Sequence, residues 1–544
     1  MADERTTEPR RLAAALSGLA AAAAAMGIAE LAAGALGRAS SAPLLAVGAG
    51  FVDLTPGWLK DFAIRRFGSA DKAVLLTGLG AGITVAALAV GLLSRRRLAR
   101  GLLGLGAFGA VGVGAALTRP VAGPADAVPS IVGALAGMAA LTLLVRAARP
   151  SSRAEHGTAA QAGGETNEDG AADRPDGPRR RSKDTGPGTE VDRRRVLLTG
   201  AGVAGVAAAG GVFGRALLRR GDVSSVRAGL RLPPPASPAR PVPRGAQVRA
   251  AGMTPFHTSG RDFYRVDTAL ALPQVDPRDW TLRIHGMVAR PVEMSFDDLL
   301  REALIERDIT LSCVSNQVGG DLAGNARWLG APLAPLLRRA GVRSGADQIL
   351  SRSADGMTLS TPAEAILDGR DAMLAVGMNG EPLPIAHGFP VRMVVPGLYG
   401  YVSATKWVVD LKVTRFATDR AYWTERGYAE HAPVKTFSRI DVPKPLAGVR
   451  AGRVTVAGTA WAQHRGVDAV EWQVDDGPWR EARLAPVPGL DTWRQWVAEW
   501  DAGPGSHTLR CRATDGTGRT QPGHRAPPFP DGATGWHSVV VTVT

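Results

Sequence analysis

The sequence predicts an α+β protein in two unlike halves. Transmembrane helices precede residue 220, and a mixed α+β region followed by an all-β region comes after it. Aromatic residues are segregated, because all five tyrosines lie between residues 264 and 428, and Trp58 is the one tryptophan of twelve before residue 280. Residues 1–220 consist mainly of Ala, Gly, Leu and Val, with arginines at the edges of apolar runs. The 544 residues suffice for roughly three or four domains.

Five uncharged apolar runs in the first half are long enough to span a membrane, which takes about 20 residues. Pro43–Val52 is too short to cross and predicts an interfacial or re-entrant segment. We therefore predict a four-span transmembrane region over residues 1–148 and a fifth helix within residues 193–217. The five runs are Leu12–Ala29, Ala73–Ser94, Gly101–Thr118, Ala127–Val145 and Val196–Gly214.

Arginines gather before the first run, between the second and third, and after the fourth. These groups share one side if the chain crosses at every run, whereas Lys60, Arg65 and Arg66 lie on the other side. The positive-inside rule then predicts a multi-pass cell-membrane protein with a cytoplasmic N-terminus and an extracytoplasmic C-terminal half. The groups are Arg10 and Arg11; Arg95, Arg96, Arg97 and Arg100; and Arg146, Arg149 and Arg153.

Residues 149–190 contain no Val, Ile, Leu, Met, Phe, Trp, Tyr or Cys. Such a segment cannot bury enough apolar surface to offset its ordering entropy. A disordered cytoplasmic linker is therefore predicted over residues 149–192. Residues 218–250 are rich in Pro and Arg and are predicted to form a tether to the C-terminal half.

Arg193, Arg194 and Arg195 immediately precede the moderately apolar fifth run. Paired arginines in that position are typical of a twin-arginine export signal. A plain membrane anchor with a positive-inside flank is the alternative. The export signal is favoured if the domain that follows carries a cofactor inserted before export.

Charge, cysteine and histidine content exclude several classes of function. The net charge of +14 comes with basic runs beside apolar segments or in the linker, so no nucleic-acid partner is expected. Two cysteines exclude a disulfide-rich scaffold and a four-cysteine zinc or iron–sulfur site. The first histidine is His156, so the first four runs lack axial haem ligands and no haem is expected in this chain.

Beyond the tether, the hydrophobic pattern predicts an α+β domain over residues 251–435 and a β-sandwich over residues 436–544. An alternating strand is expected over Trp280–His285. The expected helices are Phe296–Ala303, Ala331–Ala340 and Pro362–Leu367, and the expected sandwich strands include Val454–Gly458, Val470–Val474, Trp493–Trp500, His507–Arg512 and Val539–Val543.

Cys313 lies in Thr310-Leu-Ser-Cys-Val-Ser-Asn-Gln-Val-Gly-Gly-Asp, where a strand gives way to a segment rich in Gly and Asn. Gly319, Gly320 and Gly324 would allow a ligand to approach the backbone closely. A lone cysteine can be a small buried hydrophobe, a nucleophile that needs a nearby histidine base, or a thiolate ligand of a soft or high-valent metal. The residue types alone leave all three interpretations open.

Four ordered blocks over about residues 250–544 resemble the sulfite oxidase family of molybdopterin-dependent oxidoreductases. Cys313-Val-Ser-Asn316 is similar to the Cys-x-x-Asn signature of that family. The other blocks are Phe263-Tyr-Arg-Val-Asp267, similar to an early active-site strand; His387-Gly-Phe-Pro-Val-Arg392 with Lys406-Trp407, similar to the cofactor-binding segment; and Gly458-Thr-Ala-Trp461, Glu471–Trp479 and Arg512–Gly516, similar to the immunoglobulin-like dimerisation domain.

The resemblance implies a molybdenum-molybdopterin cofactor whose metal is ligated directly by the Cys313 thiolate. It also implies catalytic roles for Arg265, facing the metal, and for Tyr428, which would hydrogen-bond near an oxo ligand. A surface salt bridge is the alternative for each arginine. The cofactor-binding residues that it implies are Tyr264, Arg265, Cys313, Asn316, His387, Arg392, Thr405 and Lys406.

Two positions depart from the pattern of the family. Ala404-Thr-Lys406 stands where the family has Ser-Val-Lys, so Ser403 or Thr405 is expected to substitute. Asp267 stands where animal sulfite oxidases carry histidine. These departures leave the substrate and the electron acceptor open, but not the cofactor.

The resemblance implies two-electron oxygen-atom transfer, with sulfite to sulfate as the first expectation. A sulfoxide reductase, acting on methionine sulfoxide, is the alternative on the same fold. A non-catalytic immunoglobulin-like surface-binding protein is the alternative from another class. The expected partners are a small oxyanion or sulfoxide, the membrane, a separate cytochrome- or quinone-linked electron-transfer partner, and a second copy of the chain in a homodimer.

Overall fold

The computed structural model describes residues 4–56, 59, 62, 66, 71–148 and 193–544. The linker predicted over residues 149–192 lies outside the described residues, as do Lys60 and Arg65. The chain divides into two compact units. The first unit comprises Met1–Val47, Leu76–Leu117 and Pro124–Arg219, and the second comprises Gly48–Leu75, Thr118–Gly123 and Arg220–Thr544.

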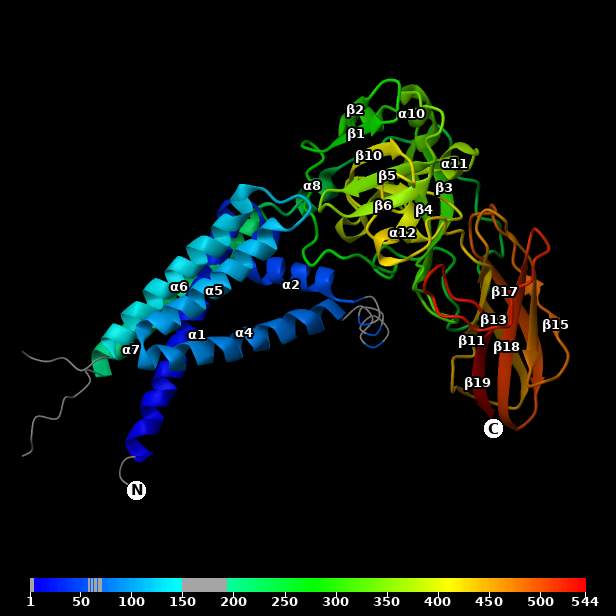
Figure 1. The fold of residues 1–544 in the computed structure, drawn as a ribbon. Coiled ribbons are helices and arrows are strands. Elements are labelled where there is room, and N and C mark those ends of the chain that lie inside the picture. Colours follow the sequence, from blue (N-terminus) through cyan, green and yellow to red (C-terminus); the bar gives the residue numbers. More distant parts are fainter. Residues whose placement is uncertain (1–3, 57–58, 60–61, 63–65, 67–70, 149–192) are drawn as a thin grey trace, which may run out of the picture. The chain divides into compact units, whose positions relative to one another are not determined.

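The first unit is a helix bundle that contains all five predicted apolar runs (Figure 1), and each is confirmed as a helix long and apolar enough to cross a membrane. Small residues bring these helices close together. A Cβ on Gly18 would lie 2.1 Å from the Ala87 carbonyl oxygen, and one on Gly133 would lie 2.6 Å from that of Ala25. Such contacts are typical of membrane helix packing. The long helices are α1 (Glu4–Ala35), α4 (Asp71–Arg96), α5 (Leu98–Leu117), α6 (Val128–Ala147) and α7 (Arg193–Arg220), and the run predicted as too short to cross forms α2 (Pro43–Leu54).

The second unit contains an α+β domain built on two sheets. One sheet has the order β2-β1-β10-β5-β6, and the other has the order β3-β4-β7-β8 with β9 paired to β7. The predicted strand and the three predicted helices are confirmed as β1, α9, α10 and α11. The elements are β1 (Thr281–Gly286), β2 (Val292–Ser295), α9 (Phe296–Leu300), β3 (Ile305–Ser312), β4 (Ala323–Pro332), α10 (Leu333–Ala340), β5 (Gln348–Ser353), β6 (Thr358–Pro362), α11 (Ala363–Leu367), β7 (Met373–Met378), β8 (Glu381–Pro382), β9 (Arg392–Val394), α12 (Gly400–Ser403) and β10 (Val408–Thr414).

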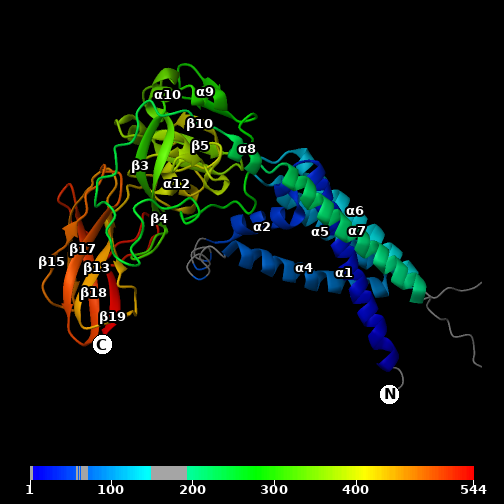
Figure 2. The ribbon, with the colours of Figure 1, turned by 180° about the vertical axis from the view of Figure 1, so that it is seen from behind.

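The C-terminal part of this unit is an all-β sandwich, and the five predicted strands are confirmed within it. Its sheets have the orders β11-β13-β17-β16 and β12-β19-β18-β14-β15, and Figure 2 shows β13 beside β17 and β18 beside β19. Cys511 is fully buried in the core between them, and burial raises the pKa of its thiol to about 12. The strands are β11 (Phe437–Val442), β12 (Gly448–Val449), β13 (Gly452–Trp461), β14 (Val467–Val474), β15 (Arg480–Glu481), β16 (Arg483–Leu484), β17 (Arg494–Ala502), β18 (Gly505–Asp515) and β19 (His537–Val543).

The segment predicted as a tether is ordered against the α+β domain. It opens with the short helix α8 (Ser224–Gly229), and Ser237 then forms a parallel bridge with Ile305 at the start of β3. The Ala236 N–H donates to the Leu304 carbonyl at 2.8 Å. Prolines remove donors along this segment but do not prevent the remaining amides from pairing with a strand edge. The segment therefore extends the sheet edge rather than hanging free.

Candidate active site

A cavity of about 390 Å³ lies in the α+β domain beside the end of β3. The structure brings most of the predicted site residues together in its wall, whereas Arg265 and Asn316 do not line it. The predicted residues that do so are Tyr264, Cys313, His387, Arg392, Thr405, Lys406 and Tyr428.

Cys313 directly follows the last residue of β3 and has a buried side chain. Its N–H donates to the Leu322 carbonyl at 2.9 Å, and its Sγ accepts from the Ser315 N–H at 3.4 Å. Burial raises the pKa of the thiol, while the Ser315 hydrogen bonds and the Lys406 charge oppose that shift. Within the described part of the chain, no cluster of three or more His, Cys, Asp or Glu residues could hold a metal ion. A metal at Cys313 would therefore take its other ligands from a cofactor or from solvent.

Two contacts hold the loop after Cys313 in place, one made by Asn316 and one made at Gly319. Asn316 is a buried residue of this loop, and its Oδ1 accepts from the Leu322 N–H at 3.0 Å. Gly319 has a φ of 80°, and a Cβ there would lie 2.2 Å from the ring of His537 in the sandwich. Only glycine fits this position. Asn316 thus shapes the loop that presents Cys313 and does not face the cavity itself.

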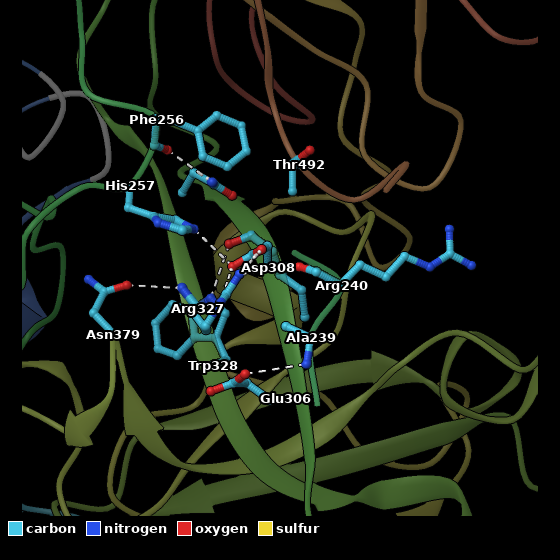
Figure 3. Close-up of polar contacts among 12 residues, drawn as sticks. Ala239, Arg240, Phe256, His257, Glu306, Asp308, Arg327, Trp328, Asn379 and Thr492 are labelled. Atoms are coloured by element: carbon cyan, nitrogen blue, oxygen red, sulfur yellow. Dashed lines mark hydrogen bonds and ion pairs between the residues drawn. The ribbon is translucent and has the colours of Figure 1, made fainter. Parts of the chain in front are cut away.

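Strand β3 is held to its neighbours by a buried carboxylate, Asp308. Figure 3 shows His257 and Arg327 directed at it: the Arg327 Nε and Nη2 atoms donate at 2.9 and 2.8 Å, and His257 Nε2 lies 2.9 Å away. Burial alone would raise the pKa of Asp308, but these hydrogen bonds hold it below its ordinary value. Asp308 and Arg327 are direct partners in the β3–β4 ladder. The pair therefore fixes the register of the strand that directly precedes Cys313.

The sandwich also forms hydrogen bonds with β3 at Thr310, three residues before Cys313. The Thr310 N–H donates to the Asp491 carbonyl at 2.8 Å, and the Thr310 Oγ1 accepts from the Trp493 N–H at 2.8 Å. Gln463 Nε2 donates to the Thr310 carbonyl at 3.0 Å. The position of Cys313 therefore depends on both domains of the second unit.

Three cationic or basic side chains, His387, Arg392 and Lys406, gather at what we name the cationic end of the cavity. Arg392 is 5% exposed, and its Nη1 and Nη2 atoms make only long bonds, to the carbonyls of His387 at 3.2 Å and Ala404 at 3.4 Å. Its Nε has no hydrogen-bond partner among the described residues, and burial lowers its pKa to about 10. A buried guanidinium with an orphaned N–H is a site for an anion.

His387 and Thr405 complete this end without adding charge. His387 Nε2 lies 2.8 Å from the Gly260 carbonyl, and burial together with Arg392 lowers the pKa of the ring to about 4. The imidazole is therefore neutral near pH 7, with the Nε2 proton donated to Gly260. Thr405 is buried, and its Oγ1 lies 2.6 Å from the hydroxyl of Ser351.

Asp267 explains why Arg265 does not line the cavity. Its carboxylate accepts from Lys406 Nζ at 2.6 Å, from Arg265 Nε at 2.8 Å and from Lys72 Nζ at 2.5 Å. Burial would raise the pKa of Asp267, but the three cations hold it far below its usual range. Burial lowers the pKa of Lys406 to about 8 despite this carboxylate. The Arg265 guanidinium is thus engaged by its near neighbour in the sequence.

A second part of the cavity lining is an aromatic wall, made of Tyr401, Trp423, Tyr428 and Phe529. Tyr428 lies at its centre, with ring centroids 5.5 Å from Tyr401, 5.2 Å from Trp423 and 5.1 Å from Phe529. The last two contacts are near edge-to-face, at 74° and 84°, an arrangement that aromatic pairs prefer. Phe529 comes from the sandwich, so both domains build this end.

Several lining residues were missed by sequence reasoning. Ser353, Asp355 and Met357 come from the β5–β6 hairpin, and Trp423 and Phe529 come from loops. The hairpin carries no motif, so only tertiary structure places it at the site. An exposed aromatic in a Pro-rich loop, as at Phe529, is the one signal that could have directed attention to the wall.

The sequence and the fold are similar to those of several known proteins. The oxidoreductase molybdopterin-binding domain matches residues 269–423. Mitochondrial sulfite oxidase of Mus musculus is 30% identical over 308 residues, which are 47% of this chain and 56% of that protein. The uncharacterized oxidoreductase YuiH of Bacillus subtilis (strain 168) is 31% identical over 153 residues, 28% of this chain and 74% of that protein. Sulfane dehydrogenase SoxCD from Paracoccus pantotrophus aligns over 51% of this chain and 80% of its own, with 24% identity and a TM-score of 0.44.

This chain belongs to the sulfite oxidase family of molybdopterin-binding oxidoreductases. The predicted family, the α+β fold and the prediction of an oxidoreductase are thereby confirmed. The chain spans about half the length of the curated sulfite oxidases that it matches.

Proposed function

We propose that this protein is a membrane-anchored molybdenum enzyme that transfers an oxygen atom at a metal held by Cys313. The observation that carries this proposal is the arrangement of one cavity. The Cys313 thiol, a soft ligand, lies in its wall. The same cavity is lined by the buried Arg392, which is suited to bind an anion, and by the aromatic wall.

The residues present fit a molybdenum-molybdopterin cofactor. Arg392 has an unsatisfied Nε and long bonds only, which suits it to an anionic phosphate tail, and His387, Thr405 and Lys406 lie in the same wall. Gly388 lets the backbone pack closely against Arg392, because a Cβ on it would lie 2.9 Å from Arg392 Cβ. The bound cofactor would supply two-electron oxygen-atom chemistry at its metal.

The side chains around Cys313 have defined tasks in this proposal. Cys313 binds the metal as a thiolate. Burial, with the nearby Cys313, raises the pKa of Tyr264 far above its ordinary value, so Tyr264 remains a phenol that can donate its proton in a hydrogen bond. Asp267 holds Lys406 and Arg265 in place, and the aromatic wall excludes water from the far end of the cavity. Arg265 therefore acts as a positioning residue through Asp267, and Tyr428 as part of the wall.

Sulfite oxidation to sulfate is the first substrate reaction to test, and sulfoxide reduction is the second. The second is favoured by the charges of the wall. Away from the cationic end, Arg426 is the one cation among the described lining residues, and its guanidinium lies 3.4 Å from the Tyr422 ring centroid. Because the family assigned is one of enzymes, the non-catalytic surface-protein alternative is set aside.

The proposed location is the extracytoplasmic face of the cell membrane, supported by the five apolar helices and the arginine distribution. Electrons would pass to or from a separate cytochrome- or quinone-linked partner, and the immunoglobulin-like resemblance of the sandwich supports a homodimer.

Export is tested by replacing Arg193 and Arg194 with lysine in the full chain. We expect the double variant to leave the second unit inaccessible to protease added outside intact cells, because a twin-arginine signal is read by its receptor through the paired arginines. Replacing Arg195 alone is the matched control. Normal external cleavage of the double variant would mean that the segment is a plain anchor.

The function itself is tested on the full chain purified from membranes of cells that make the cofactor. We expect stoichiometric molybdenum, together with turnover of either sulfite with a one-electron acceptor or methionine sulfoxide with a reduced viologen. A purified chain without molybdenum would overturn the proposal.

A further inference from the structure

The proposed cofactor accounts for only part of the cavity. The cationic end and Cys313 are assigned to it, whereas the aromatic wall has no task yet beyond excluding water. Met357 and Leu359 extend the wall with further apolar surface. Phe529 lines the cavity and is 46% exposed although it packs on Tyr428.

The wall is not an accidental contact, because the loop that carries Phe529 is anchored to the α+β domain. Lys435 Nζ binds Asp531 Oδ1 at 2.8 Å and the Gly532 carbonyl at 2.6 Å. The Ala429 N–H donates to the Pro530 carbonyl at 3.2 Å. These contacts flank Phe529 on its C-terminal side and hold its ring at the cavity.

The charges at this end do not suit an oxyanion. Among the described lining residues outside the cationic end and Asp267, the charged groups are Arg426 and Asp355, one of each sign. Arg426 is stacked on Tyr422 and donates to its carbonyl at 2.9 Å, and Asp355 accepts from the Met357 N–H at 3.2 Å. A small dianion would exchange its hydration shell for rings and a carboxylate, at a cost in free energy.

We propose that the aromatic wall binds an uncharged, apolar substituent of an organic substrate, and that Phe529 of the sandwich supplies part of the apolar contact with that substituent. This inference rests on the proposed function, since it names the substrate class of the same site. A sulfoxide with an aryl or alkyl group fits both the wall and the oxygen-atom chemistry. An inorganic oxyanion such as sulfite does not use the wall at all.

The test compares two neutral sulfoxides that differ in apolar size, dimethyl sulfoxide and methyl phenyl sulfoxide. Reduced viologen is the electron donor. Each turnover breaks one sulfur–oxygen bond, takes two electrons from two reduced viologens and two protons from solvent, and releases the thioether and water. For the full-length enzyme we expect kcat/KM to be higher for methyl phenyl sulfoxide.

The Phe529→Ala variant should change the ratio of the two kcat/KM values by about 10-fold against the larger substrate, the effect of losing one apolar contact in a specificity pocket. Leu446→Ala is the matched control, because Leu446 is a sandwich residue that is 82% exposed and does not line the cavity. We expect it to leave the ratio as in the wild type. Molybdenum content is measured on every sample.

The outcomes separate the inference from the proposed function. Enzyme that holds molybdenum and oxidises sulfite, but shows no preference for methyl phenyl sulfoxide, overturns the inference and leaves the proposed function standing. A ratio unchanged by Phe529→Ala in molybdenum-loaded enzyme also overturns it. Absence of molybdenum from the wild-type chain instead overturns the proposed function.

Discussion

The cationic end and the aromatic wall of the cavity differ in whether their side chains have partners within the protein. At the cationic end, the buried Arg392 has neither a counterion nor a partner for its Nε among the residues that the structure describes, an arrangement that costs stability until an anion binds. At the aromatic wall, rings satisfy one another and leave apolar surface open. The first arrangement is complete only with a bound anion, whereas the second is complete without one. The comparison assigns the charged end to the cofactor and the apolar end to the substrate.

The largest effect is expected from a substitution of Cys313, which lies in the wall of the same cavity. Cys313→Ser keeps the size of the side chain but replaces a soft thiolate with a poor ligand for molybdenum. We expect activity below detection with an unchanged circular dichroism spectrum. Cys511→Ser is the matched control, since that buried thiol lies in the sandwich core. Substantial turnover by Cys313→Ser would remove Cys313 from its assigned role.

A second test acts on the cationic end alone. Arg392→Met should weaken cofactor binding by about 2 kcal/mol or more, because a buried charge partner is lost. The same change should stabilise the cofactor-free protein, by about 1 kcal/mol, because an uncompensated buried charge is removed. Cofactor content measures the expected loss of binding. Thermal unfolding of the cofactor-free wild type and variant measures the expected gain in stability.

Arg392→Lys controls for charge without the planar fork of donors and should retain an intermediate amount of cofactor. If the cofactor-free Arg392→Met protein were less stable than the wild type, the description of Arg392 as an unpaired cation would be wrong.

The smallest expected effect lies outside the cavity, at the carboxylate that holds β3. Asp308→Asn should cost about 1–3 kcal/mol at pH 7, the penalty for weakening buried charged hydrogen bonds. The pKa of Asp308 is depressed in the folded protein, so its contribution is present above the ordinary value near 3.8 and is lost as the pH falls below it.

Urea unfolding between pH 3 and pH 7 checks this sign. The difference in the free energy of unfolding between the wild type and Asp308→Asn should narrow as the pH falls. A gap that stays constant with pH would mean that Asp308 contributes through packing and not through its charge. Asp276→Asn is the matched control, because its salt bridge with Arg278 is on the surface.

Much of the fold could be predicted because its signals are local. The apolar runs that became α1 and α4 to α7 need only length and composition, and the segment that follows β3, from Cys313 to Asn316, carries a family signature in the sequence itself. The family resemblance of the blocks that contain His387, Arg392 and Lys406 implied the cationic end. These residues lie on short elements whose mutual placement the family resemblance supplies.

The rest depended on contacts that spacing does not encode. Arg265 was expected to face the metal, but Asp267, two residues on, takes its guanidinium. The Pro-rich segment before residue 250 was expected to be a tether, but its free amides pair with the edge of β3. Phe529 is separated from Tyr428 by a hundred residues, so only the docking of the sandwich reveals the aromatic wall.

The proposed function depends above all on the binding of the metal by Cys313, which lines the same cavity as the cationic end and the aromatic wall. X-ray absorption at the molybdenum edge of the full-length protein tests it most directly, with Cys313→Ser loaded under the same conditions. We expect the variant to have one sulfur ligand fewer around molybdenum than the wild type. Identical sulfur shells in the two proteins would contradict it.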